Sequence, residues 1–221
     1  MVRIAPSQLT IRELIGQLMM PALPDTADLA DAATWQRVVD DQARFAFGGY
    51  IVFRGDATAT PPLLEELQDL SDVPLLISAD LERGAGQQLA GMTNFPHLMA
   101  IGAARDPDLA FQQGAITAIE ARRAGIHWIF APTLDLVNRP DNPIINIRGI
   151  GDEPRQVGNL GAAFVEGVQR HGGIACAKHF PGHGPTSARL AHASHSAISS
   201  FANSGCSAMT SCCSVRSASM S

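Results

Sequence analysis

Residues 174–184 read Ile-Ala-Cys-Ala-Lys-His-Phe-Pro-Gly-His-Gly, a short apolar run followed by one cation, two imidazoles and a turn. The apolar run predicts a buried strand, and Lys178 and His179 follow at its carboxyl end. The proline and glycines after them permit a sharp loop. Enzymes built on parallel (β/α)8 barrels carry their reacting groups on the loops that follow the strands. This stretch therefore predicts a functional strand end in such a fold.

The rest of the chain alternates between strand and helix patterns. Runs rich in β-forming residues occupy 49–53, 74–79, 125–131 and 173–177, and we expect a shorter strand at 18–22. Helical patterns separate these runs, which is the alternation of a parallel sheet covered by helices. About five βα units precede Gly184, whereas a closed barrel has eight. We therefore expect an α/β fold, an incomplete (β/α)8 TIM-type barrel.

Capping residues place three helix starts. Thr10 and Glu13 have the spacing of a capping box. Asp106 stands before a proline, an arrangement that is typical of a helix N-cap, and a glycine at 125 ends that helix. The same device recurs at residues 152–154. In each case a predicted strand follows the end of the predicted helix.

Composition indicates a globular protein with an acidic body. Hydrophobic residues make up 46% of the 221 residues, charged residues 17%, and the formal net charge is −5. Without a basic stripe, we expect neither nucleic acid nor a membrane as partner. The N-terminus lacks the apolar segment of a signal peptide, and no run approaches the roughly 20 apolar residues of a membrane span. The four cysteines match no disulfide framework or zinc spacing, so we expect a cytoplasmic protein.

Polar residues gather where the predicted strands end. Asp80 and Glu82 follow the second strand, Asp135 follows the third, and Arg148 lies in the Pro- and Asn-rich loop after it. Together with the Lys-His pair, they face one mouth of the predicted fold. Such a set suits a polyhydroxylated ligand, because each hydroxyl can donate to a carboxylate and accept from a cation.

Three of these segments, in this order and spacing, resemble the N-terminal barrel domain of glycoside hydrolase family 3. They are Asp80-x-Glu82-x-Gly84, Ala131-Pro132-Thr133-Leu134-Asp135 and the Lys-His-Phe-Pro-Gly-His-Gly stretch, and the resemblance covers residues 8–184. The Pro-Gly-His-Gly ending is similar to the β-N-acetylhexosaminidase type more than to the β-glucosidase type. The resemblance implies hydrolysis of terminal β-linked N-acetylhexosamine, including peptidoglycan-derived fragments, by a retaining mechanism without a cofactor.

Carried over by position, the resemblance implies that Asp80 accepts hydrogen bonds from the sugar at the cleavage site. Arg148, Lys178 and His179 would grip the same ring. The structural alternatives are a helix N-cap for Asp80 and a surface salt bridge for Arg148. Asp135 either contacts the sugar or anchors the loop at residues 138–146. We expect the histidine at 183 to pack or hinge its loop rather than to act as the acid.

A metal site is not expected. The histidines at 179, 183, 192 and 195 could suggest one, but their spacing matches no common zinc pattern. We therefore expect neither a metal nor any other cofactor.

The chain also departs from the family pattern. Gln88 stands where relatives carry an arginine, and Arg83 where a glycine is commoner. Relatives continue after Gly184 with Asp-Thr and then an Asp-Ser-His acid/base dyad, but here Arg189 and Ala191 occupy the Asp and His places. The nucleophile of the family, an aspartate after a later strand, would lie beyond residue 221. A retaining glycosidase needs both groups, so the resemblance implies that this chain has no turnover.

The composition changes after Gly184. Residues 185–221 contain 12 serines but no Asp, Glu or Lys. We expect residues 1–184 to form the partial barrel domain and residues 185–221 to be an irregular tail, either out of frame or disordered. β-Glucosidase or β-xylosidase activity stays open, as does a non-catalytic sugar-binding fragment. An unfinished barrel would also expose a sheet edge and favour aggregation.

Overall fold

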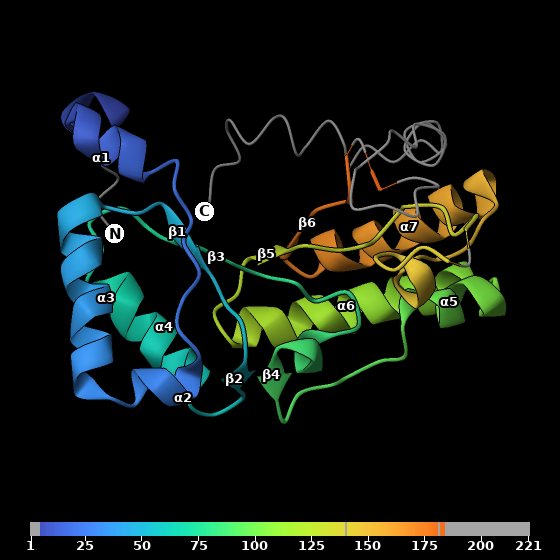
Figure 1. The fold of residues 1–221 in the computed structure, drawn as a ribbon, viewed down its shortest axis with the longest axis horizontal. Coiled ribbons are helices and arrows are strands. Elements are labelled where there is room, and N and C mark those ends of the chain that lie inside the picture. Colours follow the sequence, from blue (N-terminus) through green and yellow to red (C-terminus); the bar gives the residue numbers. More distant parts are fainter. Residues whose placement is uncertain (1–4, 140, 181, 184–221) are drawn as a thin grey trace.

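A parallel sheet forms the centre of the protein. The structure, a computed structural model, describes residues 5–139, 141–180 and 182–183. Four strands pair in the order β1-β3-β5-β6, namely β1 (Gly49–Ile51), β3 (Leu76–Ala79), β5 (Trp128–Ile129) and β6 (Ile174–Ala175). All pairs are parallel, and helices connect successive strands (Figure 1). The predicted α/β class with a parallel sheet is therefore confirmed.

The strands are shorter than the apolar runs that predict them. Each predicted run contains an observed strand, but β5 and β6 have two residues apiece. The strand expected at 18–22 is reduced to a single parallel bridge between Ala22 and Ile51 of β1. Apolar runs predict burial, and burial extends beyond the residues that pair in a ladder. The runs therefore located the strands but not their ends.

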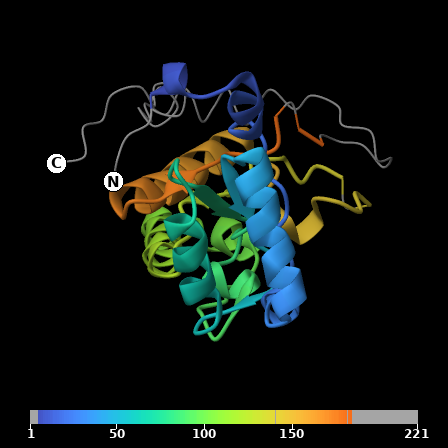
Figure 2. The same ribbon diagram turned by 90° about the vertical axis from the view of Figure 1, so that its left-hand side faces the viewer.

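Seven α-helices and three 3-10 turns are present in the described part of the chain. The helices are α1 (Ile11–Gly16), α2 (Thr26–Leu29), α3 (Ala32–Phe45), α4 (Thr60–Asp69), α5 (Leu98–Ala104), α6 (Pro107–Arg123) and α7 (Pro154–Arg170). The turns are η1 (Pro6–Gln8), η2 (Ala85–Gln87) and η3 (Asn146–Arg148). Seen from the side of α3 and α4, the strands lie behind these two helices (Figure 2).

Two of the three predicted helix starts are confirmed, and one is corrected by a residue. Thr10 caps α1 and exchanges hydrogen bonds with Glu13, and Asp106 caps α6 by accepting the N–H of Asp108. Glu153, not Asp152, caps α7, because its side chain accepts the N–H groups of the first helical turn. A carboxylate on the longer glutamate side chain can reach those orphan donors as well.

A second, two-stranded sheet was not predicted. In it β2 (Gly55–Asp56) pairs in parallel with β4 (Leu89–Ala90). Two-residue strands leave no periodic pattern in a sequence. This pair ties the segment after β1 to the segment that follows the β3 strand end.

Close packing of α6 on α7 anchors the end of the sheet that carries β5 and β6. A Cβ atom at Gly114 of α6 would collide with the carbonyl oxygen of Phe164 on α7, and one at Gly167 would collide with that of Phe111. The absent side chains let the two backbones touch. Phe164 and Ile129 of β5 are fully buried between these helices and the sheet.

No helix within the described residues is both long and apolar enough to cross a bilayer. The predicted tail at 185–221 lies outside the described residues, so its expected irregularity stays a prediction.

Candidate active site

Two strand ends bring an ammonium group between two carboxylates. Lys178, which follows β6, places its Nζ atom 2.5 Å from Asp80 Oδ1 and 2.6 Å from Glu82 Oε1. Both carboxylates follow β3, which is not a direct neighbour of β6 in the sheet. The side chain of Lys178 is only 12% exposed, so its charge is held among these partners rather than in water. Groups 98 residues apart in sequence thus form one cluster.

Arg148 joins this cluster from the loop after β5. Its Nε and Nη2 donate to the two oxygens of Glu82 at 3.0 and 2.7 Å, and its Nη1 donates to the carbonyl oxygen of Ile144 at 2.9 Å. The loop that carries Arg148 is shaped by Asn142, whose Oδ1 accepts the N–H groups of Ile144 and Ile145. A two-point bond of this kind fixes the plane of a guanidinium as well as its position.

Backbone pairing between the ends of β5 and β6 aligns the next group of residues. Thr133 forms a parallel bridge with Lys178, and Leu134 donates its N–H to the Lys178 carbonyl at 2.7 Å. Lys178 in turn donates its N–H to the carbonyl of Pro132 at 3.0 Å. This pairing sets Asp135, two residues after Thr133, beside His179, the residue after Lys178.

Asp135 is the buried acceptor for two histidines. One oxygen accepts the backbone N–H of His179 at 3.0 Å and contacts its ring Nδ1 at 2.7 Å. The other accepts the backbone N–H of His183 at 2.6 Å, and the two imidazole rings meet edge to face at 4.6 Å. A carboxylate beside Nδ1 favours the tautomer with the proton there, which leaves Nε2 of His179 to accept a hydrogen bond.

Neighbouring charges and hydrogen bonds set the ionisation of these groups. Burial by itself would raise the pKa of Glu82, but the hydrogen bond from Arg148 and the charge of Lys178 outweigh it and lower the pKa to about 2. Burial would likewise raise the pKa of Asp135, and the hydrogen bonds from His179 and His183 lower it instead. For His183, burial and the nearby His179 lower the pKa, so this ring is disposed to be neutral.

The structure brings together the residues that the sequence singled out. Asp80 follows β3 directly and does not cap a helix, and Arg148 is paired with a buried carboxylate rather than with a surface partner. Asp135 accepts hydrogen bonds from His179 and His183. Among the described residues, its side chain forms no hydrogen bond with the loop at 138–146. Gln88 lies at the same mouth, where its Nε2 donates to the carbonyl of Asp80 at 3.3 Å. That sugar contacts these groups stays a prediction.

Glu82 is the residue whose importance the sequence reading missed. The sequence places Glu82 in a motif but predicts no separate role for it. Its side chain is 7% exposed and touches both cations of the cluster. The sequence does contain one signal. Glu82 stands two residues after Asp80 at one strand end, and other strand ends carry Arg148 and Lys178, which need a carboxylate partner. The pairing itself spans 66 residues and leaves no local pattern.

The assembled cluster can bind hydroxyl groups but offers no obvious metal site. No group of three His, Cys, Asp or Glu side chains within the described residues is arranged to hold a metal ion. His192 and His195 lie outside those residues. The outward groups comprise a carboxylate, two cations and an imidazole nitrogen, which together can donate to and accept from several hydroxyls of one ring.

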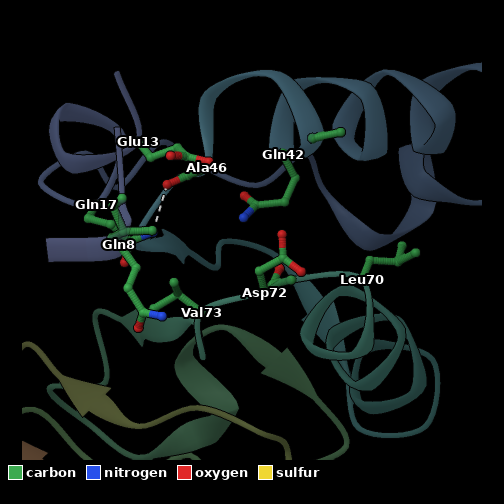
Figure 3. A pocket seen from close by; sticks show the side chains of 11 residues that line it. Gln8, Glu13, Gln17, Gln42, Ala46, Leu70, Asp72 and Val73 are labelled. Atoms are coloured by element: carbon green, nitrogen blue, oxygen red, sulfur yellow. Dashed lines mark hydrogen bonds between the residues drawn. The ribbon is translucent and has the colours of Figure 1, made fainter. Parts of the chain in front are cut away.

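A separate polar cavity lies at the opposite end of the sheet. Its volume is about 280 Å³, and its lining comes from α1, the end of α3 and the segment before β3 (Figure 3). Gln17 donates to the carbonyl of Ala46, and Gln42 accepts from the hydroxyl of Tyr50. The side chains of both glutamines therefore hold the segment that leads into the strand β1. The cavity has no contact with the strand-end cluster.

Comparison with known proteins identifies related sequences and structures. The family model for the N-terminal domain of glycosyl hydrolase family 3 matches residues 10–200, past the boundary expected at Gly184. A β-hexosaminidase of Thiobacillus denitrificans is 35% identical over 169 residues, 71% of this chain and 47% of that protein. A β-N-acetylglucosaminidase/β-glucosidase of Cellulomonas fimi is 41% identical over 129 residues, 58% of this chain and 22% of that protein.

Solved structures agree. A family 3 β-N-acetylglucosaminidase from Paenibacillus superposes with a TM-score of 0.75 at 33% identity, covering 90% of this chain and 41% of that one. The chain spans less than half the length of each of these three relatives. The resemblance drawn from the motifs is confirmed: the chain belongs to glycosyl hydrolase family 3 and matches its N-terminal domain.

Proposed function

We propose that residues 10–183 form the sugar-binding part of a family 3 β-N-acetylhexosaminidase. The observation that carries this proposal is the cluster of Asp80, Arg148, Lys178 and His179 at adjoining strand ends. Asp80 accepts from sugar hydroxyls, and the two cations and His179 Nε2 bind the oxygens and hydroxyls of the same ring. Charge-assisted hydrogen bonds of this kind contribute roughly 1.5 to 3 kcal/mol each.

The reaction we propose for the complete enzyme is retaining hydrolysis of a terminal β-linked N-acetylhexosamine. One carboxylate attacks the anomeric carbon while a second group protonates the leaving oxygen, and water then releases the sugar. The cluster of this chain holds the ring while its charge grows toward an oxocarbenium ion, so its hydrogen bonds strengthen in the transition state. Peptidoglycan-derived fragments are the natural candidates for the substrate.

The chain of 221 residues itself is proposed to bind sugar without turnover. Within the described cluster both carboxylates of the β3 end are bound to Lys178, and Asp135 is buried beneath two histidines. None of these three is placed as a free nucleophile. After residue 184 the sequence holds no Asp or Glu that could serve instead.

Binding of N-acetylglucosamine to the 221-residue chain tests this proposal. We expect saturable chemical-shift changes in the NMR spectrum that Asp80→Asn weakens by about ten- to a hundredfold, the value of one charged hydrogen bond. Asp69→Asn is the matched control, because Asp69 ends α4 at the opposite end of the sheet. Equal binding by both variants would contradict the proposed site.

A second specificity is favoured by the name of one relative. The Cellulomonas fimi protein is called a β-N-acetylglucosaminidase/β-glucosidase. Titrating glucose and xylose beside N-acetylglucosamine distinguishes the alternatives. Tighter binding of glucose or xylose would favour a β-glucosidase or β-xylosidase.

A further inference from the structure

Glu82 lies beneath the groups that would meet a sugar. Its side chain is 7% exposed, whereas those of Asp80 and Arg148 are 33% and 31% exposed. One oxygen, Oε1, is 2.7 Å from Arg148 Nη2 and 2.6 Å from Lys178 Nζ. The other, Oε2, accepts from Arg148 Nε at 3.0 Å. Glu82 thus contacts both cations from the inner side.

We propose that Glu82 is a positioning residue, which fixes Arg148 and Lys178 in the orientation in which they bind the sugar without touching the sugar itself. This inference rests on the proposed function. It assigns a role to a side chain for which the sequence motif gave none.

The donors of the two cations can be counted. A guanidinium has five N–H groups. Arg148 directs two of them to Glu82 and one to the Ile144 carbonyl within the described residues, which leaves two for a ligand. An ammonium has three N–H groups. Lys178 directs one to Asp80 and one to Glu82, which leaves one. Glu82 therefore binds two N–H groups of Arg148 and one of Lys178 on the inner side, and so determines which N–H groups of these two cations remain available to a ligand.

The charges of the cluster lead to the same role. Arg148 and Lys178 share one oxygen of Glu82, so their ammonium and guanidinium groups lie close together. Without the carboxylate between them, the two cations would repel one another. Lys178 would then depend on Asp80 alone, and Asp80 is the acceptor that the sugar hydroxyls need.

Helix α6 holds Glu82 in turn. Gln113, which is 3% exposed, donates its Nε2 to the Glu82 carbonyl at 3.2 Å. Thr117 donates its hydroxyl to the carbonyl of Gln113 one turn back along the helix. The backbone of Glu82 is therefore tied to a packed helix rather than left in a free loop.

The test compares Glu82→Gln and Glu82→Asp with a matched control, Glu120→Gln. Glu120 on α6 is a partly buried carboxylate that accepts from the N–H and hydroxyl of Thr93, outside the cluster. Two properties of the 221-residue chain are measured by NMR: the Nε–H signal of Arg148 and the affinity for N-acetylglucosamine. Dispersed amide spectra establish that each variant is folded. If Glu82→Gln does not fold, Glu82→Asp, which keeps the negative charge, is compared with the parent chain instead.

We expect Glu82→Gln to shift the Arg148 Nε–H signal and to weaken sugar binding at least about tenfold. Glu82→Asp should recover part of both, and Glu120→Gln should change neither. An unaltered Arg148 signal and affinity in Glu82→Gln, or an equal loss of affinity in Glu120→Gln, would overturn the proposal. If the parent chain binds no sugar while Glu82→Gln still shifts the Arg148 signal, the proposed function fails, but the positioning of the cations by Glu82 is supported.

Discussion

At the scale of single residues, Asp135 shows how one carboxylate can order the end of a strand. Its side chain is fully buried, and it receives two N–H groups from His179 and one from His183. A carboxylate accepts all three without conflict. An amide of the same shape would direct its NH₂ group at one of these donors.

Asp135→Asn should therefore destabilise the protein by about 1.5 to 3 kcal/mol at pH 7, the value of one charged hydrogen bond. The hydrogen bonds lower the pKa of Asp135 from its ordinary 3.8, so the stabilisation is complete above that pH and is lost as the pH falls through the lowered value. Urea unfolding at several pH values measures the difference. A difference that stayed constant into strong acid would contradict this role.

Gln88 stands at the position where the family resemblance implies an arginine. Its side chain donates to the carbonyl of Asp80 and accepts the N–H of Arg54, both at 3.3 Å. Gln88→Arg gives up these two long hydrogen bonds but adds a cation beside Asp80. We expect tighter binding of N-acetylglucosamine by about tenfold, the value of one charged hydrogen bond.

Gln112→Arg, on the exposed side of α6, is the control for the added charge in the same NMR titration. Unchanged affinity in Gln88→Arg, or an equal gain in the control, would show that position 88 is not a sugar contact.

At the scale of elements, the contact between α6 and α7 supports the strand ends that carry the cluster. Gly114→Ala places a methyl group against the carbonyl of Phe164. Overpacking of this kind typically costs 1 to 3 kcal/mol, so we expect a loss of about that size in the free energy of unfolding. Gly151→Ala is the control, because a Cβ there meets no atom within 4 Å. Equal stability of the two variants would mean that the helices can move apart freely.

His127 links two strands through its ring. The ring Nδ1 accepts the backbone N–H of Ile77 at 3.2 Å, while the backbone N–H of His127 donates to the Ile77 carbonyl at 2.8 Å. Burial and, next, the charge of Arg122 lower the pKa of His127 from 6.5 to about 4. The unfolded chain therefore binds more protons in this range, and stability is complete above pH 6.5 and is lost as the pH falls toward 4.

His127→Asn should remove that pH dependence, because the Asn Oδ1 can accept the same N–H and does not titrate. Thermal melts between pH 4 and 7 measure it. A variant that loses stability as steeply as the parent would assign the effect to another group.

The sequence predicts local features better than pairings. The capping box of Thr10 and Glu13 and the cap at Asp106 were correct, because both are set within one helical turn. The positions of Asp80 and Lys178 after their strands were also correct, since apolar runs locate strands. The pairing of Glu82 with Arg148 and the short β2–β4 ladder were missed, because each joins segments far apart in the chain.

At the scale of the whole molecule, apolar side chains lie open along α1 and the segment after it. Ile11, Ile15 and Leu18 are 78%, 57% and 88% exposed, and Ile11 and Ile15 line an apolar hollow together with Phe45. Exposed apolar patches favour association. The poor solubility expected from the sequence stays a prediction, and this surface is a physical reason for it.

The 221-residue chain should release no product from an aryl β-N-acetylglucosaminide above the uncatalysed rate. Enzymes lower barriers by about 8 to 23 kcal/mol, and a retaining glycosidase loses most of that without its nucleophile and its acid. The positive control is a full-length relative such as the Thiobacillus denitrificans β-hexosaminidase. Turnover by the purified chain that survives Asp80→Ala would place the chemistry outside the strand-end cluster.

The nucleotide sequence around codon 185 provides the complementary test. A shifted frame should encode Asp-Thr and then Asp-Ser-His after Gly184, and the protein expressed in that frame should hydrolyse the aryl glycoside. Lys178→Ala in this repaired protein should lower kcat/KM by about ten- to a hundredfold, because it removes a charged contact that strengthens as the ring becomes cationic. If neither frame encodes the dyad, the residues after Gly184 are this chain's own sequence, and the frame-shift hypothesis is wrong.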